Sequence, residues 1–269
     1  MFRLLTIEFH KLKHNKASKV LSIIYFGLLA CIALIASIKI PLFGKTIHFA
    51  EYGIFNFPYI WHFNTYIASI LKFFLLLVIV SMMSNEYSYK TLKQNLIDGL
   101  SKKEFILSKF YTVIVFALIS TVFVFLVSLI LGLFYSDYTE LAIITSDLQY
   151  LLAFFIKLVG FFSMGLFFGI LVKRSAFAVG GMVVWFFIEN ITRGSLYWIF
   201  RNLENTNDKV NNIVQFFPLE SMYNLIKNPF ERLGAVKSIV TMAGGEYKLN
   251  YAVEFSTILI VSAWTFIFI

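Results

Sequence analysis

The chain of 269 residues is 59% hydrophobic and only 14% charged, and it contains 32 phenylalanines. Soluble domains carry about 25% charged residues, so this composition excludes an ordinary soluble protein and predicts a membrane protein. The formal net charge is +8. In a membrane protein a basic balance reflects topology and anionic lipid head groups, so we expect membrane lipids, and not nucleic acid, as partners.

Six apolar stretches are long enough to cross a bilayer, because a transmembrane helix needs about 20 mostly apolar residues. A β-barrel would instead show alternating hydrophobicity over segments of about ten residues. We therefore predict an all-α polytopic fold that forms a single domain over residues 1–269. The six stretches are residues 20–40, 66–84, 110–134, 150–172, 175–199 and 251–269.

The placement of lysine and arginine predicts the orientation, because cytoplasmic loops keep positive charge. The N-terminal segment and alternate loops carry twelve basic and four acidic residues, which gives +8 and accounts for the whole net charge. Both termini are therefore predicted to be cytoplasmic. The residues are Arg3, Lys11, Lys13, Lys16, Lys19, Lys90, Lys93, Lys102, Lys103, Lys109, Lys173 and Arg174, against Glu8, Glu86, Asp98 and Glu104.

Residues 1–19 have the pattern of a helix that lies in the membrane interface. Phe2, Leu5, Phe9 and Leu12 fall at helical spacing, and basic residues surround them. An apolar face between basic residues is typical of interfacial helices. We expect this helix to lead directly into the first apolar stretch.

The first outer loop, residues 41–65, is rich in aromatic side chains. It contains Phe55, Phe57, Tyr59 and Trp61. Aromatic residues gather at the level of the lipid head groups. We predict that these four side chains anchor the loop there.

The charged segment 85–109 has clear helix boundaries. Asn85 can cap a helix that begins at Glu86, and Asp98-Gly99 provides a left-handed stop. Ser101-Lys102-Lys103-Glu104 is a capping box that opens the next helix. The sequence therefore predicts a helix, a turn and a second helix.

The first of these helices, residues 86–98, is predicted to be amphipathic. Tyr89, Leu92 and Leu96 fall on one face, whereas Lys90 and Lys93 point elsewhere. A short cytoplasmic helix needs something to cover its apolar face. The pattern alone leaves two candidates, the membrane surface and a partner protein.

Residues 200–250 form the one large outer region. Its segments 213–219 and 223–226 are too apolar for a free loop and too short to span the bilayer. Short helices that dip back toward the membrane would explain both properties. We predict such helices here.

Four ionisable residues lie within the apolar stretches, where such residues are candidates for function. They are Lys72, Lys157, Glu189 and Arg193, all in the outer half of the predicted spans. Glu189 and Arg193 are four residues apart on one helix and are expected to pair, with Lys72 or Lys157 able to join them. The group serves either helix packing, with snorkelling lysines, or an outer polar gate or cargo contact on a translocation path at the permease interface.

Several short motifs together resemble those of type-2 ATP-binding-cassette (ABC) exporter permeases. The six spans and the two cytoplasmic termini resemble the same family in layout. One departure is the end of the chain at Ile269, inside the sixth stretch, where family members usually add a basic tail. The motifs are Leu5-x-x-Glu8-x-x-Lys11, the run from Glu86 to Thr91, Leu100-Ser101-Lys102-Lys103, Lys109 and Phe217-Pro218-Leu219.

The resemblance implies a division of labour along the chain. Residues 1–19 would be the family's elbow helix, and residues 86–98 its coupling helix, which docks on an ATP-binding-cassette ATPase subunit. Residues 200–250 would hold the outer re-entrant helices. The residues implied to couple to the ATPase are Glu86, Tyr89, Thr91, Leu92, Leu96, Lys102 and Lys103.

The resemblance also implies the partners and the location. Two permease subunits, identical or different, would face each other across the substrate path in a bacterial cytoplasmic membrane. ATP and Mg²⁺ would bind to the ATPase subunits, and this chain would bind no cofactor or metal. Small bacterial members of the family export peptides, antibiotics, lipids or ions, and we expect an amphipathic or hydrophobic cargo.

The chain lacks a nucleotide-binding motif of its own. Gly44-Lys45-Thr46 ends like a P-loop, but that motif requires glycine at position 39, which is Lys39. The sequence therefore predicts that another chain hydrolyses ATP, and that this chain is not an enzyme.

Two other classes of function remain open at this stage. An ATP-independent transporter or a membrane scaffold would need no ATPase partner. An intramembrane protease of the prenyl type is disfavoured because Ile188 replaces the first glutamate of its Glu-Glu-x-x-x-Arg motif, and because no histidine follows His62.

Overall fold

The computed structural model describes every residue except 1, 38, 43–44, 49–52, 204 and 233–250. The described part is helical apart from one antiparallel hairpin, in which Lys39 pairs with His48 and Leu42 with Lys45. The elements are α1 (Phe2–His14), α2 (Lys16–Ser37), β1 (Lys39–Leu42), β2 (Lys45–His48), α3 (Tyr59–Ser88), α4 (Thr91–Ile97), α5 (Lys102–Tyr135), α6 (Leu141–Thr145), α7 (Gln149–Val172), α8 (Ser175–Phe200), α9 (Thr206–Val214), α10 (Pro218–Asn224), the 3₁₀ turn η2 (Pro229–Arg232) and α12 (Phe255–Ile267).

Four helical segments are long and apolar enough to cross a membrane, or five if α1 and α2 together count as one bent span. The four are α3, α5, α6 with α7, and α8. Helix α12 has only 13 residues, about 20 Å at 1.5 Å per residue, against a hydrocarbon core of about 30 Å. The predicted all-α class is confirmed, with the small hairpin as an addition, whereas the count of six spans stays a prediction.

The N-terminal segment forms two helices where the sequence predicted one, and its position in the membrane interface stays a prediction. Residues 3–14 and 16–32 form two helices that meet at an angle of 91°. The prediction of one interfacial helix over residues 1–19 was too long, because the chain turns at Asn15. The Asn15 side chain accepts the Ser18 backbone N–H at 3.2 Å, and so it satisfies a donor in the first turn of α2.

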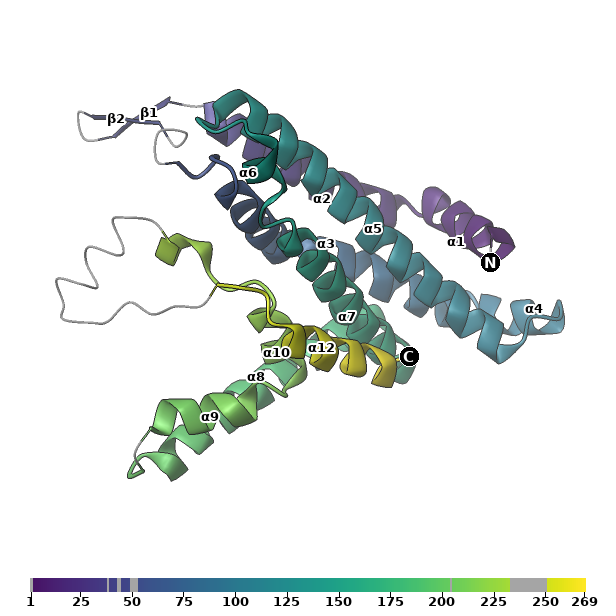
Figure 1. Ribbon diagram of the computed structural model, residues 1–269. Helices are drawn as coiled ribbons and strands as arrows, with labels where there is room; N and C mark the ends of the chain where they lie inside the picture. The colour runs from purple at the N-terminus through teal and green to yellow at the C-terminus, as the bar shows by residue number, and fades with distance from the viewer. Residues whose placement is uncertain (1, 38, 43–44, 49–52, 204, 233–250) are drawn as a thin grey trace.

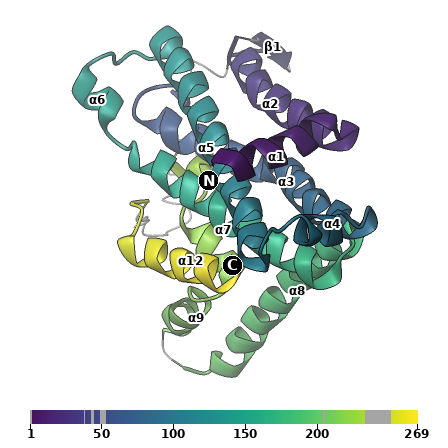
Figure 2. The ribbon, with the colours of Figure 1, turned by 90° about the vertical axis from the view of Figure 1, so that its right-hand side faces the viewer.

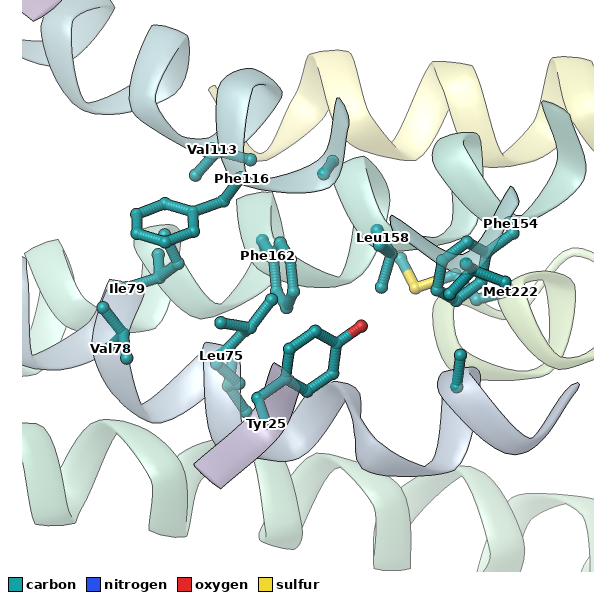
Figure 3. Packing of buried hydrophobic residues seen from close by; sticks show 14 of the residues in the cluster. Tyr25, Leu75, Val78, Ile79, Val113, Phe116, Phe154, Leu158, Phe162 and Met222 are labelled. Atoms are coloured by element: carbon teal, nitrogen blue, oxygen red, sulfur yellow. The ribbon is translucent and has the colours of Figure 1, made fainter. Parts of the chain in front are cut away.

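Helices α3 and α7 form the centre of the bundle. Helix α7 packs on α3, α5, α8 and α12. Figure 3 shows the packed side chains, among them the fully buried Tyr25, Leu75, Phe154 and Phe162. Helices associate in lipid mainly by close packing, so this centre fixes the positions of the surrounding elements.

Three of the four aromatic residues of the first outer segment pack inside the protein and are not free to anchor the segment in the lipid head groups. Phe55, Phe57 and Trp61 are buried, and only Tyr59 is exposed. Helix α3 begins at Tyr59, so Trp61 is already inside the bundle, where it stacks on Phe125 with centroids 5.5 Å apart. Its indole N–H donates to the Ile144 carbonyl at 2.9 Å, which makes burial of the polar edge favourable.

The outer region contains two short helices, α9 and α10, whose bounds are offset from the apolar segments 213–219 and 223–226 that the sequence analysis singled out. Met222, Leu225 and Ile226 are buried, and α10 contacts α7, α8 and α12. Packing against the helical bundle therefore explains why these residues of the outer region are apolar. Their entry into the bilayer stays a prediction.

The two ends of the molecule differ in the elements they carry. Helices α1 and α4 lie at one end, on the right in Figure 1, while the hairpin, α6 and α9 lie toward the left. Figure 2 views the molecule from the right-hand side, with α1 and α4 facing the reader. The loop between α7 and α8 also lies beside the end of α3, since the Lys173 ammonium lies 5.7 Å from the centre of the Tyr87 ring. The segments predicted to be cytoplasmic therefore meet at one end.

Candidate functional site

The charged segment after α3 is built differently from the predicted helix over residues 86–98. Helix α3 continues through Glu86 to Ser88, and the Tyr89 N–H still bonds to the Asn85 carbonyl at 2.9 Å. Lys90 then adopts a left-handed conformation with φ 57°, and α4 follows as Thr91–Ile97. No glycine or proline interrupts the chain between residues 66 and 98. Nothing therefore ends α3 at Asn85, and the predicted start was wrong.

The predicted end of the segment is confirmed. Gly99 has φ 94°, its N–H bonds to Leu96 at 3.3 Å, and the Leu100 N–H bonds to Asn95 at 3.0 Å. This pair of bonds is the Schellman motif. Both halves of the capping box between Ser101 and Glu104 are present at the start of α5. The orientation of α4 between two long helices is therefore fixed at its C-terminal end by backbone geometry.

Four charged side chains from three helices meet beside α4. The Lys109 ammonium of α5 donates to Glu8 Oε2 of α1 at 2.5 Å and to Glu86 Oε1 of α3 at 2.6 Å. The Lys11 ammonium of α1 donates to the same Glu86 oxygen at 2.8 Å and lies 3.8 Å from Glu8 Oε1. We call Glu8, Lys11, Glu86 and Lys109 the four-charge cluster.

The four-charge cluster is closed to solvent on one side. The side chain of Lys109 is 0% exposed and those of Glu8 and Glu86 are 4% and 3% exposed, whereas that of Lys11 is 34% exposed. Two carboxylates and two ammonium groups sum to zero, so no net charge is buried. Each charge that loses its partner would remain buried and unpaired, and breaking such a pair costs about 3–5 kcal/mol.

Glu86 also holds α4 directly. Its second oxygen, Oε2, accepts the Thr91 hydroxyl at 2.5 Å and the Asn95 side-chain amide at 3.3 Å. One carboxylate therefore bonds to α4 through one oxygen and to α1 and α5 through the other. A displacement of α4 is resisted by three helices at once.

The apolar face of α4 is turned differently from the prediction. Leu92 packs on the core and Leu96 is half-buried, so these side chains face the bundle. Tyr89 precedes α4 and is 75% exposed, and Ile97 at its end is 79% exposed. The predicted common face of Tyr89, Leu92 and Leu96 was wrong, because the left-handed residue Lys90 separates Tyr89 from α4.

The solvent-facing surface at this end is basic and concave. Lys90, Lys93, Lys102 and Lys103 are all exposed. A hollow of about 540 Å³ lies between the junction of α1 with α2 and the junction of α3 with α4. Its lining is Lys11, Leu12, His14, Asn15, Lys16, Ala17, Met82, Asn85, Glu86, Tyr89 and Thr91.

The residues of this site lie within a segment of the chain that matches a known family. Residues 4–189 match the family described as ABC-2 family transporter protein, which is more than half of the chain. The chain belongs to the ABC-2 transporter family. No curated protein and no solved structure matches it. The match includes α1, α4 and the whole four-charge cluster, and it identifies the chain as an ABC permease subunit of type 2.

In this ABC-2 permease, Glu189 and Arg193 do not pair with each other as predicted. Glu189 accepts the backbone N–H groups of Leu219 at 3.0 Å and Glu220 at 3.2 Å, and the Trp185 indole at 2.7 Å. Arg193 instead donates to both oxygens of Glu220 at 3.1 Å. The first turn of α10 presents backbone donors with no partner in its own helix, and these satisfy Glu189 better than a neighbour on α8.

Glu220 belongs to this outer contact between α8 and α10. Burial raises the pKa of its carboxyl, and the Arg193 guanidinium opposes that shift. Arg193 and Glu189 therefore fasten α10 to α8.

Lys72 and Lys157 of the ABC-2 permease do not join these residues. Lys157 is 2% exposed, and both lysines line one cavity between α3, α7, α8 and α10. Among the described residues, no carboxylate lies within ion-pair distance of either ammonium group. Because α3 runs over 30 residues from Tyr59 to Ser88, Lys72 lies just on the outer side of the centre of its helix.

Sequence analysis missed three members of the four-charge cluster as site residues. Glu8, Lys11 and Lys109 were part of the motifs that resemble the family, but they were not assigned a role. Lys109 stands at the edge of an apolar stretch, and Glu8 and Lys11 are three residues apart on one helix face. These are signals for charges that need partners.

Proposed function

We propose that this ABC-2 protein is the membrane subunit of an exporter that moves an amphipathic or hydrophobic cargo outward. A separate ATP-binding-cassette subunit binds ATP and Mg²⁺ and hydrolyses ATP. A second permease subunit, identical or different, completes the substrate path. The assembly lies in a bacterial cytoplasmic membrane, with both termini of this chain in the cytoplasm.

One observation carries this proposal. A short helix with an exposed surface, α4, is fixed through Glu86 to its two neighbours in the sequence, α3 and α5, and to the distant helix α1. A partner that pushes on α4 therefore moves α1, α3 and α5 together. That is the mechanical property needed to convert the closure of ATPase subunits into movement of a permease.

Each predicted coupling residue receives a distinct role in this proposal. Tyr89 contacts the ATPase, and so does Ile97, which was not among the predicted coupling residues, since both side chains are exposed. Glu86 and Thr91 transmit the force, because their hydrogen bond joins α4 to the four-charge cluster.

The other predicted coupling residues act around that link. Leu92 and Leu96 seat α4 on the bundle. Lys102 and Lys103, exposed at the start of α5, attract an acidic surface of the ATPase.

The basic surface also supports the proposed orientation. Helix α1 with the start of α2, helix α4 with its preceding residue Lys90, the start of α5 and the loop at Lys173 meet at one end of the bundle. Together they carry twelve of the 23 basic residues. Positively charged segments are retained on the cytoplasmic side. An ATPase with access to ATP lies on that same side.

The experiment is a detergent pull-down of the tagged chain with identification of the proteins that copurify. We compare the wild type with Tyr89→Asp/Ile97→Asp. The matched control is Tyr138→Asp/Leu141→Asp, which places charge on an exposed aromatic and an exposed aliphatic residue near the opposite end. Recovery of an ATP-binding-cassette ATPase with wild type and control, and its loss with the α4 variant, supports the proposal.

Recovery of no such ATPase from gently solubilised membranes would contradict the proposal. It would favour an ATP-independent transporter or a scaffold. Equal recovery with both double variants would contradict the assignment of α4 as the contact.

A further inference from the structure

A cavity of about 380 Å³ lies within the bundle, away from the four-charge cluster. It is bounded by α3, α7, α8 and α10, and its size is within the range of small-molecule sites, about 300–1,000 Å³. Apart from Ser69 and the two lysines, its lining side chains are apolar or aromatic. A cavity with this lining accepts hydrocarbon but contains two strong hydrogen-bond donors.

Neither lysine of this cavity has a carboxylate within ion-pair distance in the part of the chain that the structure describes. The Lys72 ammonium lies 4.4 Å from the centre of the Phe161 ring, and the Lys157 ammonium lies 5.9 Å from that of Tyr223. Aromatic faces stabilise a cation without neutralising it. Lys157 is 2% exposed, so its charge is largely shielded from water. We call this cavity, with Lys72 and Lys157, the lysine pocket.

An unpaired buried charge is strongly unfavourable unless something compensates it. In the four-charge cluster the compensation comes from carboxylates of the chain itself. In the lysine pocket the described residues supply none within ion-pair distance. An anion that enters from outside would supply the missing charge.

The surroundings of the lysine pocket fit the apolar part of a ligand. Ile70 and Phe73 of α3 and Val183 and Phe186 of α8 line the pocket and are exposed. They form an apolar rim that continues from the lysines to the outside of the bundle. A hydrocarbon chain can lie on this rim while its head group remains at the lysines.

We propose that the lysine pocket binds the anionic head group, a phosphate or a carboxylate, of an amphiphile whose hydrocarbon tail lies on the rim between α3 and α8. This inference deepens the proposed function, because it names the chemical class of the cargo, and it rests on that proposal only in calling the amphiphile a cargo. The binding itself requires neither an ATPase nor ATP.

The test uses the full-length chain in phosphatidylcholine vesicles that contain a trace of phosphatidylglycerol with a photoreactive group in its acyl chain. After illumination, the labelled peptides are mapped by mass spectrometry. We expect labels on residues 70–73 and 183–186. Added decyl phosphate should displace the label, whereas decanol, which has the same tail without the charge, should not.

The variant Lys72→Met/Lys157→Met should reduce labelling by about tenfold or more, since a charge-assisted hydrogen bond contributes on the order of 1.5–3 kcal/mol. Lys209→Met is the control, because Lys209 is exposed on α9 and outside the lysine pocket. Lys72→Arg keeps the charge and should retain labelling, which separates loss of charge from loss of folding.

Two results would overturn the inference. One is equal labelling by a photoreactive phosphatidylcholine, whose head group has no net charge. The other is unchanged labelling of the double variant. If decyl phosphate that carries a photoreactive group labels these residues but phosphatidylglycerol does not, the ligand is a free single-chain amphiphile and not a bilayer lipid, and the anion site stands. All of these results are independent of whether an ATPase copurifies.

Discussion

The four-charge cluster and the lysine pocket each contain a buried lysine, but the surroundings of the two lysines differ. Lys109 in the cluster has two carboxylate partners at 2.5 and 2.6 Å. Lys157 in the pocket has an aromatic ring at 5.9 Å and no carboxylate within ion-pair distance among the described residues.

This difference distinguishes a cluster that holds helices together from a pocket that binds a ligand. Charges that are paired within the chain lock helices together, because moving one of them exposes or strands another. Charges that lack a partner leave capacity for a ligand. In one permease, the first arrangement is suited to transmitting force from α4, and the second to holding a cargo.

The largest expected effect on stability is that of Lys109→Met, which tests the four-charge cluster. The substitution leaves the carboxylates of Glu8 and Glu86 buried with only Lys11 nearby, so we expect a loss of about 3–5 kcal/mol in the free energy of unfolding. Thermal unfolding of the detergent-solubilised protein measures it. Lys93→Met on the exposed face of α4 is the control. An equal, small effect of both substitutions would show that the cluster does not hold the helices together.

The same substitution at Lys157 should act in the opposite direction. Lys157→Met replaces an uncompensated ammonium group by an apolar side chain of similar length, and should raise the free energy of unfolding by about 1–3 kcal/mol. The thermal melting point measured without added amphiphile should rise. A fall comparable to that of Lys109→Met would break the comparison, because it would mean that Lys157 has a partner within the protein.

For Thr91→Val we expect a smaller effect on the free energy of unfolding than for either lysine substitution. We expect a large effect on the coupling between cargo and ATP hydrolysis. It removes the hydroxyl that donates to Glu86, which costs about 1 kcal/mol. ATP hydrolysis by the partner, measured in vesicles, should lose most of its stimulation by cargo. Thr145→Val is the control, since the Thr145 hydroxyl bonds only to backbone carbonyls of its own helix. Full stimulation in Thr91→Val would separate α4 from the coupling path.

The smallest expected effect is that of Arg193→Leu, at a residue that belongs to neither of the two regions compared. The Arg193 side chain is 38% exposed, so loss of its pair with Glu220 should cost about 1 kcal/mol or less. Since burial raises the pKa of Glu220, the difference from wild type should vanish as the pH falls below that pKa and the carboxyl becomes neutral. Thermal melting across the acidic range measures this. A difference that does not depend on pH would assign Arg193 a packing role instead.

Local features of the fold could be predicted from the sequence because they depend on neighbouring residues. The turn at Gly99 and the capping box at Ser101 are determined within a few residues, and both are present. The end of α3 was predicted wrongly because Asn85 is a good cap but is not a strong stop. The burial of Trp61 was missed because it depends on Phe125 and Ile144.

The candidate sites depend on contacts between distant segments, and the sequence alone does not determine those contacts. Lys109 and Glu8 are separated by 101 positions, and their pairing follows from the angle at which α1 meets the bundle. The Glu189–Arg193 pair was predicted from their spacing on one helix. That prediction was wrong because α10, which lies elsewhere in the sequence, offers better partners to both.

The most direct test of the account replaces Ile97 with a photoreactive benzoylphenylalanine in living cells and identifies what is captured on illumination. The same amino acid at Leu141, equally exposed on α6, is the control. The account predicts capture of an ATP-binding-cassette ATPase from position 97 and not from position 141. Capture of lipid alone at position 97, or of the ATPase at both positions, would contradict the role of α4 as the docking element.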